Sequence, residues 1–186
     1  NSLNVYFSDI ESDSVNISNK QIQKTVKNFN LKKLKLVVPV HFAGLPCDMK
    51  SINKLSKKKK FHLIEDAAHG LGALYNCGSK VGSCKYSLAT VFSLHPVKSI
   101  AAGEGGIITT NSSSFYKKLL RIRSHGINKI DDEFINKKLS ETNGNKNPWY
   151  YEMQQLGFHY RITDIQCALA NSQLKKLNKF ILKRKS

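Results

Sequence analysis

Short apolar runs alternate with amphipathic segments along this chain, and this alternation most restricts what it can fold into. Runs at 5–10, 34–40 and 61–64 predict strands, and two segments with helical spacing of apolar residues separate them. Strands that alternate with helices form a mostly parallel sheet with helices on its faces. Further runs at 88–94 and 106–110 predict two more strands of the same sheet. We therefore expect an α/β fold.

The predicted helices begin at residues with short polar side chains, which can accept a hydrogen bond from the first helical turn. Ser18 and Asp48 should cap the first two helices, and Ser112 or Ser113 should open a third that ends at His125-Gly126. The longest predicted helix covers 163–185. The polar segment 127–148 predicts a surface loop with at most a short helix. Apolar residues at helical spacing support these helices: Ile22, Val26 and Phe29; Ile52 and Leu55; and Ile165, Leu169, Leu174, Leu177 and Ile181.

The length of 186 residues suffices for one sizeable core and favours one domain. No apolar run is long enough for a membrane-spanning helix. The chain lacks an initial methionine and its last residues still follow a helical pattern, so we expect an internal piece of a longer protein. The four cysteines match no zinc template and nothing marks a secreted scaffold, which favours reduced thiols in the cytoplasm.

The formal net charge of +17 raises the question of nucleic-acid binding. Apart from a run at 57–60, however, the lysines are scattered, and no basic motif interleaved with aromatic residues accompanies them. We expect a solvated basic surface rather than a nucleic-acid partner.

Chemically active residues follow the ends of two predicted strands. Glu65-Asp66-Ala67-Ala68-His69 follows the run at 61–64. Ser93 lies at the end of the run at 88–94, and Lys98 lies in the loop after it. In open α/β sheets the ligand crevice lies at the carboxyl ends of the strands, so these residues should share it. A carboxylate, an imidazole, a hydroxyl and a lysine can hold pyridoxal phosphate and form a Schiff base with it. The following Gly103-Glu104-Gly105-Gly106 predicts a turn that requires glycine.

Four blocks occur in a fixed order: Pro39-Val40-His41-Phe42-Ala43-Gly44; Glu65-Asp66-Ala67-Ala68-His69; Phe92-Ser93-Leu94-His95-Pro96-Val97-Lys98 with Gly103-Glu104-Gly105-Gly106; and Gly157-Phe158-His159-Tyr160-Arg161-Ile162-Thr163-Asp164-Ile165-Gln166. In this order they resemble the DegT-type nucleotide-sugar aminotransferases, which are pyridoxal-phosphate enzymes of fold type I. The resemblance extends over essentially the whole chain. It implies the large domain of that fold, a mostly parallel sheet flanked by helices.

The segment Trp149-Tyr150-Tyr151-Glu152-Met153, with Leu156-Gly157-Phe158, is most similar to family members of pseudaminic acid biosynthesis. Those members aminate C4 of a UDP-linked 4-keto-6-deoxy sugar. The resemblance thus implies a nucleotide-sugar substrate, an amino-acid donor, usually glutamate, and a cytoplasmic homodimer that makes surface polysaccharide precursors without nucleic-acid or membrane partners.

The resemblance gives four residues roles toward the cofactor. Lys98 is the predicted Schiff-base lysine and catalytic residue; alternatively it is one more surface lysine. Asp66 should keep the pyridine nitrogen protonated, or else it caps the segment after its strand. His69 should stack on the ring or bond its phenolic oxygen, unless it is a core histidine. Ser93, five positions before Lys98, lies where the family places a hydroxyl on the phosphate.

Four further residues are predicted around the substrate or the dimer interface. His159 aligns with a segment that in relatives reaches the partner subunit's cofactor phosphate, where many relatives have asparagine. Arg161 suits an anionic substrate group or an interface salt bridge. His41 follows a strand end and should line the substrate crevice, or else it belongs to a tight structural turn. His95 lies between Ser93 and Lys98 and should face the substrate, or else it is structural.

The family's phosphate-gripping loop, its ring-stacking aromatic residue and its small C-terminal domain have no counterpart in this sequence. We therefore expect residues 1–186 to be a partial pyridoxal-phosphate-binding large domain that binds the cofactor weakly by itself. One alternative is a sugar 3-dehydratase of the same fold, in which histidine replaces the lysine; Lys98 argues against it. Another is a non-catalytic protein with a basic surface.

Overall fold

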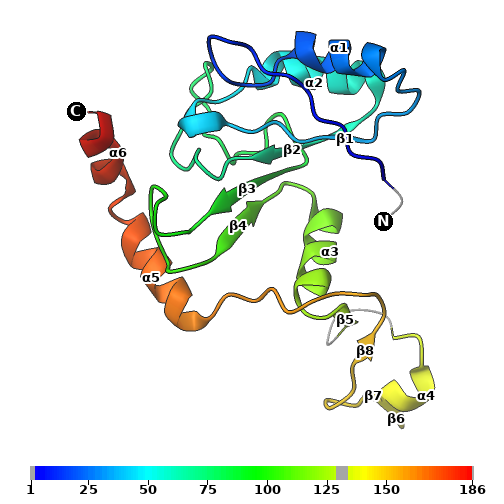
Figure 1. Cartoon of the computed structure of the whole chain (residues 1–186). Helices are drawn as coiled ribbons and strands as arrows, with labels where there is room; N and C mark the ends of the chain where they lie inside the picture. Colours follow the sequence, from blue (N-terminus) through cyan, green and yellow to red (C-terminus); the bar gives the residue numbers. More distant parts are fainter. Residues whose placement is uncertain (1–2, 129–133, 186) are drawn as a thin grey trace. The chain divides into compact units, whose positions relative to one another are not determined.

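The computed structural model describes residues 3–128 and 134–185, and the chain divides into two compact units. Unit 1 comprises residues 1–111 and 163–186, and unit 2 comprises residues 112–162. A sheet of four strands forms the centre of unit 1 (Figure 1). In spatial order its strands are β1 (Leu36–Val37), β2 (His62–Asp66), β3 (Ala89–Ser93) and β4 (Gly106–Thr109).

The sheet is mostly parallel, as the sequence predicts. β1, β2 and β3 run parallel, and β4 is antiparallel to β3 because a single loop connects them. In this register Asp66 lies beside Val91, and Ser93 lies beside Gly106. The carboxyl ends of β2 and β3 therefore meet at one edge of the sheet.

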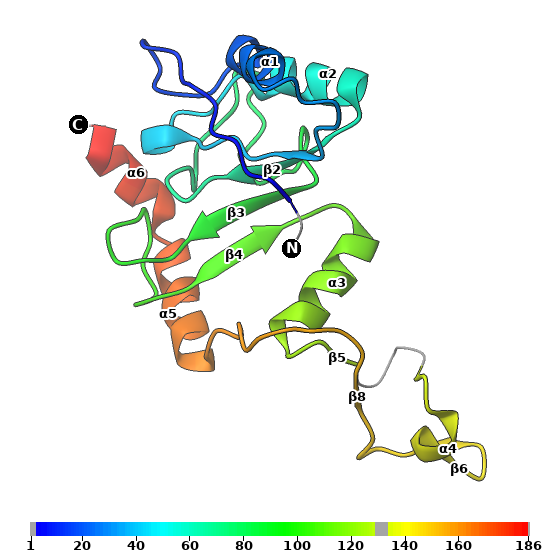
Figure 2. The same cartoon turned by 45° about the vertical axis from the view of Figure 1, so that its right-hand side comes forward.

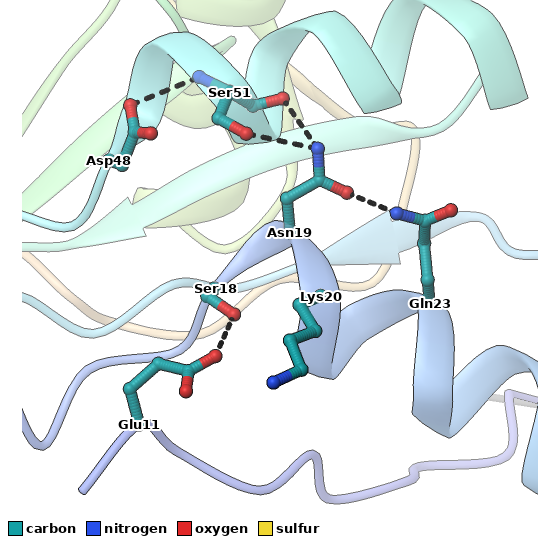
Figure 3. A pocket seen from close by; sticks show the side chains of 7 residues that line it. All are labelled: Glu11, Ser18, Asn19, Lys20, Gln23, Asp48 and Ser51. Atoms are coloured by element: carbon teal, nitrogen blue, oxygen red, sulfur yellow. Dashed lines mark hydrogen bonds between the residues drawn. The ribbon is translucent and has the colours of Figure 1, made fainter.

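Helices α1 (Asn19–Asn28) and α2 (Met49–Lys59) lie side by side over one face of this sheet (Figure 1). Their predicted N-caps are confirmed, since Ser18 accepts a hydrogen bond from the backbone of Gln21 and Asp48 accepts one from Ser51. The side chain of Asn19 joins the two helices through Ser51 Oγ at 3.0 Å (Figure 3). Local polar side chains thus fix where both helices begin.

The core of unit 1 lies between these helices and the sheet. Its members come from α1, from one face of α2, from β2 and β3, and from the segments that connect these elements. Burial of this kind stabilises a fold by about 25 cal/mol per Å² of apolar surface. The buried cluster consists of Ile22, Cys47, Met49, Ile52, Leu55, Phe61, Leu63, Ala67, Tyr75, Val81 and Phe92.

Two expected features of the first forty residues are wrong. Residues 5–10 form no strand, and Phe7 is 90% exposed. The run at 34–40 yields only the two residues of β1 and an isolated bridge between Val40 and Asp66. Leu36 and Val38 are exposed, so this strand is not covered on both faces. Leu36, Val38 and Val40 are exposed at alternate positions, so one face of this segment lacks cover from the described residues.

The long helix expected over 163–185 is broken into α5 (Asp164–Leu174) and α6 (Leu177–Lys185). Thr163 caps α5 as predicted, in a capping box with Gln166. The apolar stripe is largely exposed, and Ile165 is 83% exposed. Ile181 packs instead at Gly72, where α6 approaches the loop that follows β2. Figure 2 shows both helices beside the loop between β3 and β4.

Unit 2 contains α3 (Ser113–Arg123), β5 (Ile127–Asn128), α4 (Lys137–Ser140), β6 (Glu141–Thr142), β7 (Asn145–Lys146) and β8 (Glu152–Met153). β5 pairs with β8, and β6 pairs with β7. The predicted loop at 127–148 thus holds short strands and one short helix, and its residues 129–133 lie outside the described part. Gly126 has φ +70°, and a Cβ there would lie 1.7 Å from the carbonyl oxygen of Gln155.

None of the described helices is both long and apolar enough to cross a membrane. The four cysteines form no disulfide with one another.

Candidate active site

The predicted cofactor residues of unit 1 lie at one edge of its sheet. Asp66 ends β2 and Ser93 ends β3. Because Asp66 pairs with Val91 and side chains alternate along a strand, Asp66, Val91 and Ser93 point to the same face. That face is only half-buried, whereas Glu65, Thr90 and Phe92 occupy the buried face. The strand register therefore brings the carboxylate and the hydroxyl to one side of the sheet.

The carboxylate of Asp66 is only partly used within the protein. One oxygen, Oδ1, accepts a hydrogen bond of 2.9 Å from the backbone N–H of Ala68. The other oxygen has no hydrogen-bond partner in residues 3–128 and 134–185. The bond to Ala68 is the capping contact that the sequence left open as an alternative, yet it leaves one oxygen for a ligand.

Ser93 and His95 shape the start of the loop that carries Lys98. Ser93 Oγ accepts a hydrogen bond from the backbone of His95 at 3.2 Å, so its own proton remains able to be donated. His95 Nδ1 accepts from the backbone of Val97, and its carbonyl accepts from the backbone of Lys98. His95 Nε2 lies 3.8 Å from the Glu104 carboxylate. His95 therefore holds a tight turn, which matches its structural alternative and leaves its substrate role a prediction.

Lys98 is half-buried, and within the described residues its amine forms no hydrogen bond or ion pair. Its carbonyl accepts a 2.8 Å hydrogen bond from Arg184 of α6. Farther along the same loop, the carbonyl of Glu104 accepts a bond from Gln166 of α5. Gly103 has φ +79°, as expected for a turn that requires glycine. Two C-terminal helices thus hold the backbone of the lysine loop while the amine stays available.

His69 is exposed at the same end of β2. Its Nδ1 accepts a 3.3 Å hydrogen bond from the backbone of Ala43, so the proton of the neutral ring sits on Nε2. Phe42 makes an edge contact with the ring at a centroid distance of 6.2 Å. Both neighbours belong to the 3-10 turn η1 (Phe42–Gly44). The turn orients the His69 ring, which is therefore not a core histidine.

The predicted substrate role of His41 is contradicted by its position. His41 is completely buried, with both ring nitrogens in internal hydrogen bonds. Nε2 lies 2.7 Å from Glu65 Oε2, and Nδ1 accepts from the backbone of Cys47 at 3.2 Å. A ring in this position cannot touch a substrate in the crevice. The alternative, a tight structural turn after the strand, describes it correctly.

Sequence reasoning missed the hydrogen-bond network around Glu65. This carboxylate is fully buried and accepts hydrogen bonds from His41, Tyr75, Ser87 and Thr90. Burial alone would raise the pKa of Glu65, but the hydrogen bonds from His41, Ser87 and Tyr75 outweigh burial and hold its pKa below the ordinary 4.5. Strand alternation was an available signal, since it places residue 65 on the face opposite Asp66.

The other two predicted residues lie in unit 2. His159 is exposed, forms an isolated bridge with Ser124, and contacts the His125 ring at a centroid distance of 5.5 Å. Arg161 is also exposed. Their roles at a dimer interface and toward an anionic substrate stay predictions.

The residues at the edge of the sheet fit pyridoxal phosphate. Asp66 has an unpaired carboxylate oxygen that would suit the pyridine nitrogen, Ser93 has a proton that would suit the phosphate, and Lys98 has an amine that would suit the aldehyde. An open hollow of about 570 Å³ lies elsewhere, between the N-termini of α1 and α2, and none of these three residues lines it (Figure 3). The predicted cofactor residues therefore lie outside this hollow.

Comparisons with known proteins concern the chain as a whole rather than its single residues. The family model described as the DegT/DnrJ/EryC1/StrS aminotransferase family matches residues 1–186. A UDP-4-amino-4,6-dideoxy-N-acetyl-beta-L-altrosamine transaminase of Campylobacter jejuni is 38% identical over 181 residues, which are 97% of this chain and 42% of the relative. A UDP-4-amino-4-deoxy-L-arabinose--oxoglutarate aminotransferase of Shewanella sediminis is 32% identical over 180 residues, 96% of this chain and 42% of the relative.

Among solved structures, Helicobacter pylori PseC, an aminotransferase involved in the biosynthesis of pseudoaminic acid, matches with a TM-score of 0.76 and 32% identity. The match covers 93% of this chain and 40% of that one. It confirms the predicted fold type I architecture. The chain spans about two fifths of the length of these relatives.

Proposed function

We propose that this chain, which belongs to the DegT/DnrJ/EryC1/StrS aminotransferase family, is the central part of the large domain of a pyridoxal-phosphate-dependent nucleotide-sugar aminotransferase. One observation carries the proposal: Asp66 and Ser93 point to the same face at the ends of neighbouring strands, and the loop that follows Ser93 presents the free amine of Lys98. Family membership supports the reaction class.

The bound cofactor supplies an electron sink that makes a proton of the amino-acid donor acidic. The roles of the chain's own residues follow from the protons and hydrogen bonds that each side chain can donate or accept. Lys98 anchors the cofactor and then moves a proton with its amine. Asp66 holds a proton at the pyridine nitrogen through its unpaired oxygen. Ser93 binds a phosphate oxygen, and the η1 turn sets the orientation of His69 against the ring.

The substrate class follows from the names of the relatives, two of which are transaminases of UDP-linked 4-amino sugars. We propose that the full-length protein transfers an amino group from glutamate to C4 of a UDP-linked 4-keto-6-deoxy sugar, for surface polysaccharide biosynthesis in the cytoplasm. The carbonyl of the sugar becomes an amine while glutamate becomes 2-oxoglutarate. A homodimer is proposed as well, with His159 and Arg161 near the partner subunit and the substrate.

The first test is cofactor linkage by the full-length protein. Added pyridoxal phosphate should gain the absorbance, near the edge of the visible range, of a cofactor linked to a lysine. Lys98→Ala should abolish this absorbance, whereas Lys80→Ala, which removes an exposed lysine from an isolated β-bridge with Leu74, should keep it. An unchanged spectrum in Lys98→Ala would refute the assignment of the lysine.

The second test is the reaction itself. With glutamate and the UDP-linked keto sugar, mass spectrometry should detect the amino sugar and 2-oxoglutarate in equal amounts. Loss of the sugar's 3-hydroxyl without amination would favour the dehydratase. Salt-dependent binding of unrelated DNA, with no spectral change on addition of cofactor, would instead favour a non-catalytic protein.

A further inference from the structure

A buried carboxylate lies directly beside Asp66 in the sequence and on the opposite face of the sheet. Both oxygens of Glu65 are fully used. Oε2 accepts from His41 Nε2 at 2.7 Å and from the Tyr75 hydroxyl at 2.5 Å. Oε1 accepts from the Ser87 hydroxyl and, at 3.4 Å, from Thr90 Oγ1. A fully buried carboxylate that accepts from four donors holds the segments of those donors in fixed positions.

The histidine of this network has a defined tautomer. Because the backbone N–H of Cys47 donates to His41 Nδ1, that nitrogen carries no proton. The proton of the neutral ring therefore sits on Nε2 and is donated to Glu65. His41 thus connects Glu65 to the turn between β1 and α2, the same turn that orients His69.

The donors to Glu65 come from several segments of unit 1. His41 lies in the turn after β1, Tyr75 lies in the loop after β2, and Thr90 lies within β3. The backbone of Asp66 is held by the same turn, since its N–H donates to Pro39 and its carbonyl accepts from His41, both at 2.9 Å. Among residues 3–128 and 134–185, the Asp66 side chain accepts one hydrogen bond, from Ala68, so its direction depends on this backbone.

We propose that Glu65 is a positioning residue that fixes the direction of Asp66 and His69 toward the cofactor. Glu65 touches neither cofactor nor substrate. It acts by joining the turn after β1, the loop after β2 and strand β3 at a single buried point. This inference rests on the proposed function, because it concerns Asp66 as a cofactor ligand.

The network allows a conservative replacement. In Glu65→Gln the amide oxygen can take the place of Oε2 and accept from His41 and Tyr75. The amide nitrogen then takes the place of Oε1 and donates to the hydroxyls of Ser87 and Thr90, which can rotate to accept. Glu65→Ala loses all these contacts. Positioning therefore predicts a large difference between the two variants.

The experiment measures two properties of each variant of the full-length protein. The first is the Kd for pyridoxal phosphate. The second, in the cofactor-free protein, is hydrogen exchange at the Ala68 amide, which donates to Asp66. We expect Glu65→Ala to raise both Kd and exchange rate about tenfold or more, and Glu65→Gln to stay within about threefold of wild type. Leu55→Ala removes a core side chain from α2 and is the control for a general loss of stability. It should leave the Kd for pyridoxal phosphate and the exchange rate at Ala68 close to those of wild type.

Wild-type cofactor affinity and unchanged Ala68 exchange in Glu65→Ala would overturn the inference, as would equal losses in Leu55→Ala. If Glu65→Ala fails to fold, Ser87→Ala removes a single donor and is measured in the same way, with the same direction of change expected. If the wild-type protein does not bind pyridoxal phosphate, the proposed function fails, while exchange at Ala68 still decides whether Glu65 positions Asp66.

Discussion

Replacement of Tyr75 by phenylalanine removes one hydroxyl from the buried network and leaves the ring in place. The hydroxyl oxygen lies 2.5 Å from Glu65 Oε2, and both residues are buried. A hydrogen bond to a charged group contributes about 1.5–3 kcal/mol to stability. The edge contact of the ring with Tyr86 requires no hydroxyl from residue 75. We therefore expect Tyr75→Phe to lower the free energy of unfolding by about 2 kcal/mol near neutral pH.

The pH dependence of this loss has a defined sign. The folded-state pKa of Glu65 is lowered below 4.5, so its network contributes stability that is present above this value and is lost as the pH falls through the folded pKa. The Tyr75 hydroxyl is one of the groups that lower this pKa, after His41 and Ser87. Its removal raises the pKa of Glu65, so the difference between wild type and Tyr75→Phe should shrink as the solution is acidified below 4.5.

Urea unfolding monitored by circular dichroism, at neutral pH and at about pH 3, measures both effects. Tyr86→Phe is the matched control, because the Tyr86 hydroxyl contacts the exposed Cys77 rather than Glu65. It should cost less than about 0.5 kcal/mol. A loss in Tyr75→Phe that stays constant between the two pH values would refute the reasoning, as would a loss as small as that of the control.

Three further predictions concern other parts of the chain. Cys77 should be alkylated by iodoacetamide with a midpoint near pH 6, because hydrogen bonds with neighbouring hydroxyls lower its pKa to about 6, whereas burial raises the pKa of Cys47 to about 12 and should keep it unreactive. Gly126→Ala should destabilise unit 2 by about 2 kcal/mol or more, seen as faster proteolysis within 112–162, since its Cβ would meet a backbone carbonyl at 1.7 Å. Arg184→Met should raise amide hydrogen exchange in the Lys98 loop about threefold to tenfold, because that loop loses one hydrogen bond.

Each of these predictions has a control in the same chain. Cys77→Ser should remove the label, and labelling that appears only well above pH 6 would contradict the lowered pKa. Gly78 also has a positive φ, of +78°, but nothing lies within 4 Å of a Cβ added there. If Gly78→Ala destabilises the protein as much as Gly126→Ala, backbone strain rather than the clash with Gln155 causes the loss. Lys179→Met removes another exposed cation of α6. If it raises amide exchange in the Lys98 loop as much as Arg184→Met does, the hydrogen bond from Arg184 does not hold that loop.

Local features of this protein were predictable from the sequence, and long-range features were not. Ser18, Asp48 and Thr163 cap their helices as predicted, because each bonds a backbone group three residues away. The strand ends that carry Asp66 and Ser93 were also predicted, since the apolar runs stop there.

The hydrogen bonds of Glu65 could not be predicted from the sequence in this way. Its donors lie 10 to 25 positions away in the sequence, and apart from Thr90 of β3 they lie outside the described strands. His41 was expected in the crevice because it follows a strand end, yet the buried acid draws its ring inward. The fate of an apolar residue such as Leu36 or Ile165 depends on which elements cover it, and spacing alone does not contain this information.

The two hydrogen bonds that tether the lysine loop also set an order of events during synthesis. Arg184 lies 86 positions after Lys98, and Gln166 lies 62 positions after Glu104. A ribosome adds about 5–20 residues per second, so the strands on both sides of the loop emerge several seconds before either tether exists. A nascent chain therefore carries β3, β4 and the lysine loop between them before α5 and α6 can hold the backbone of that loop.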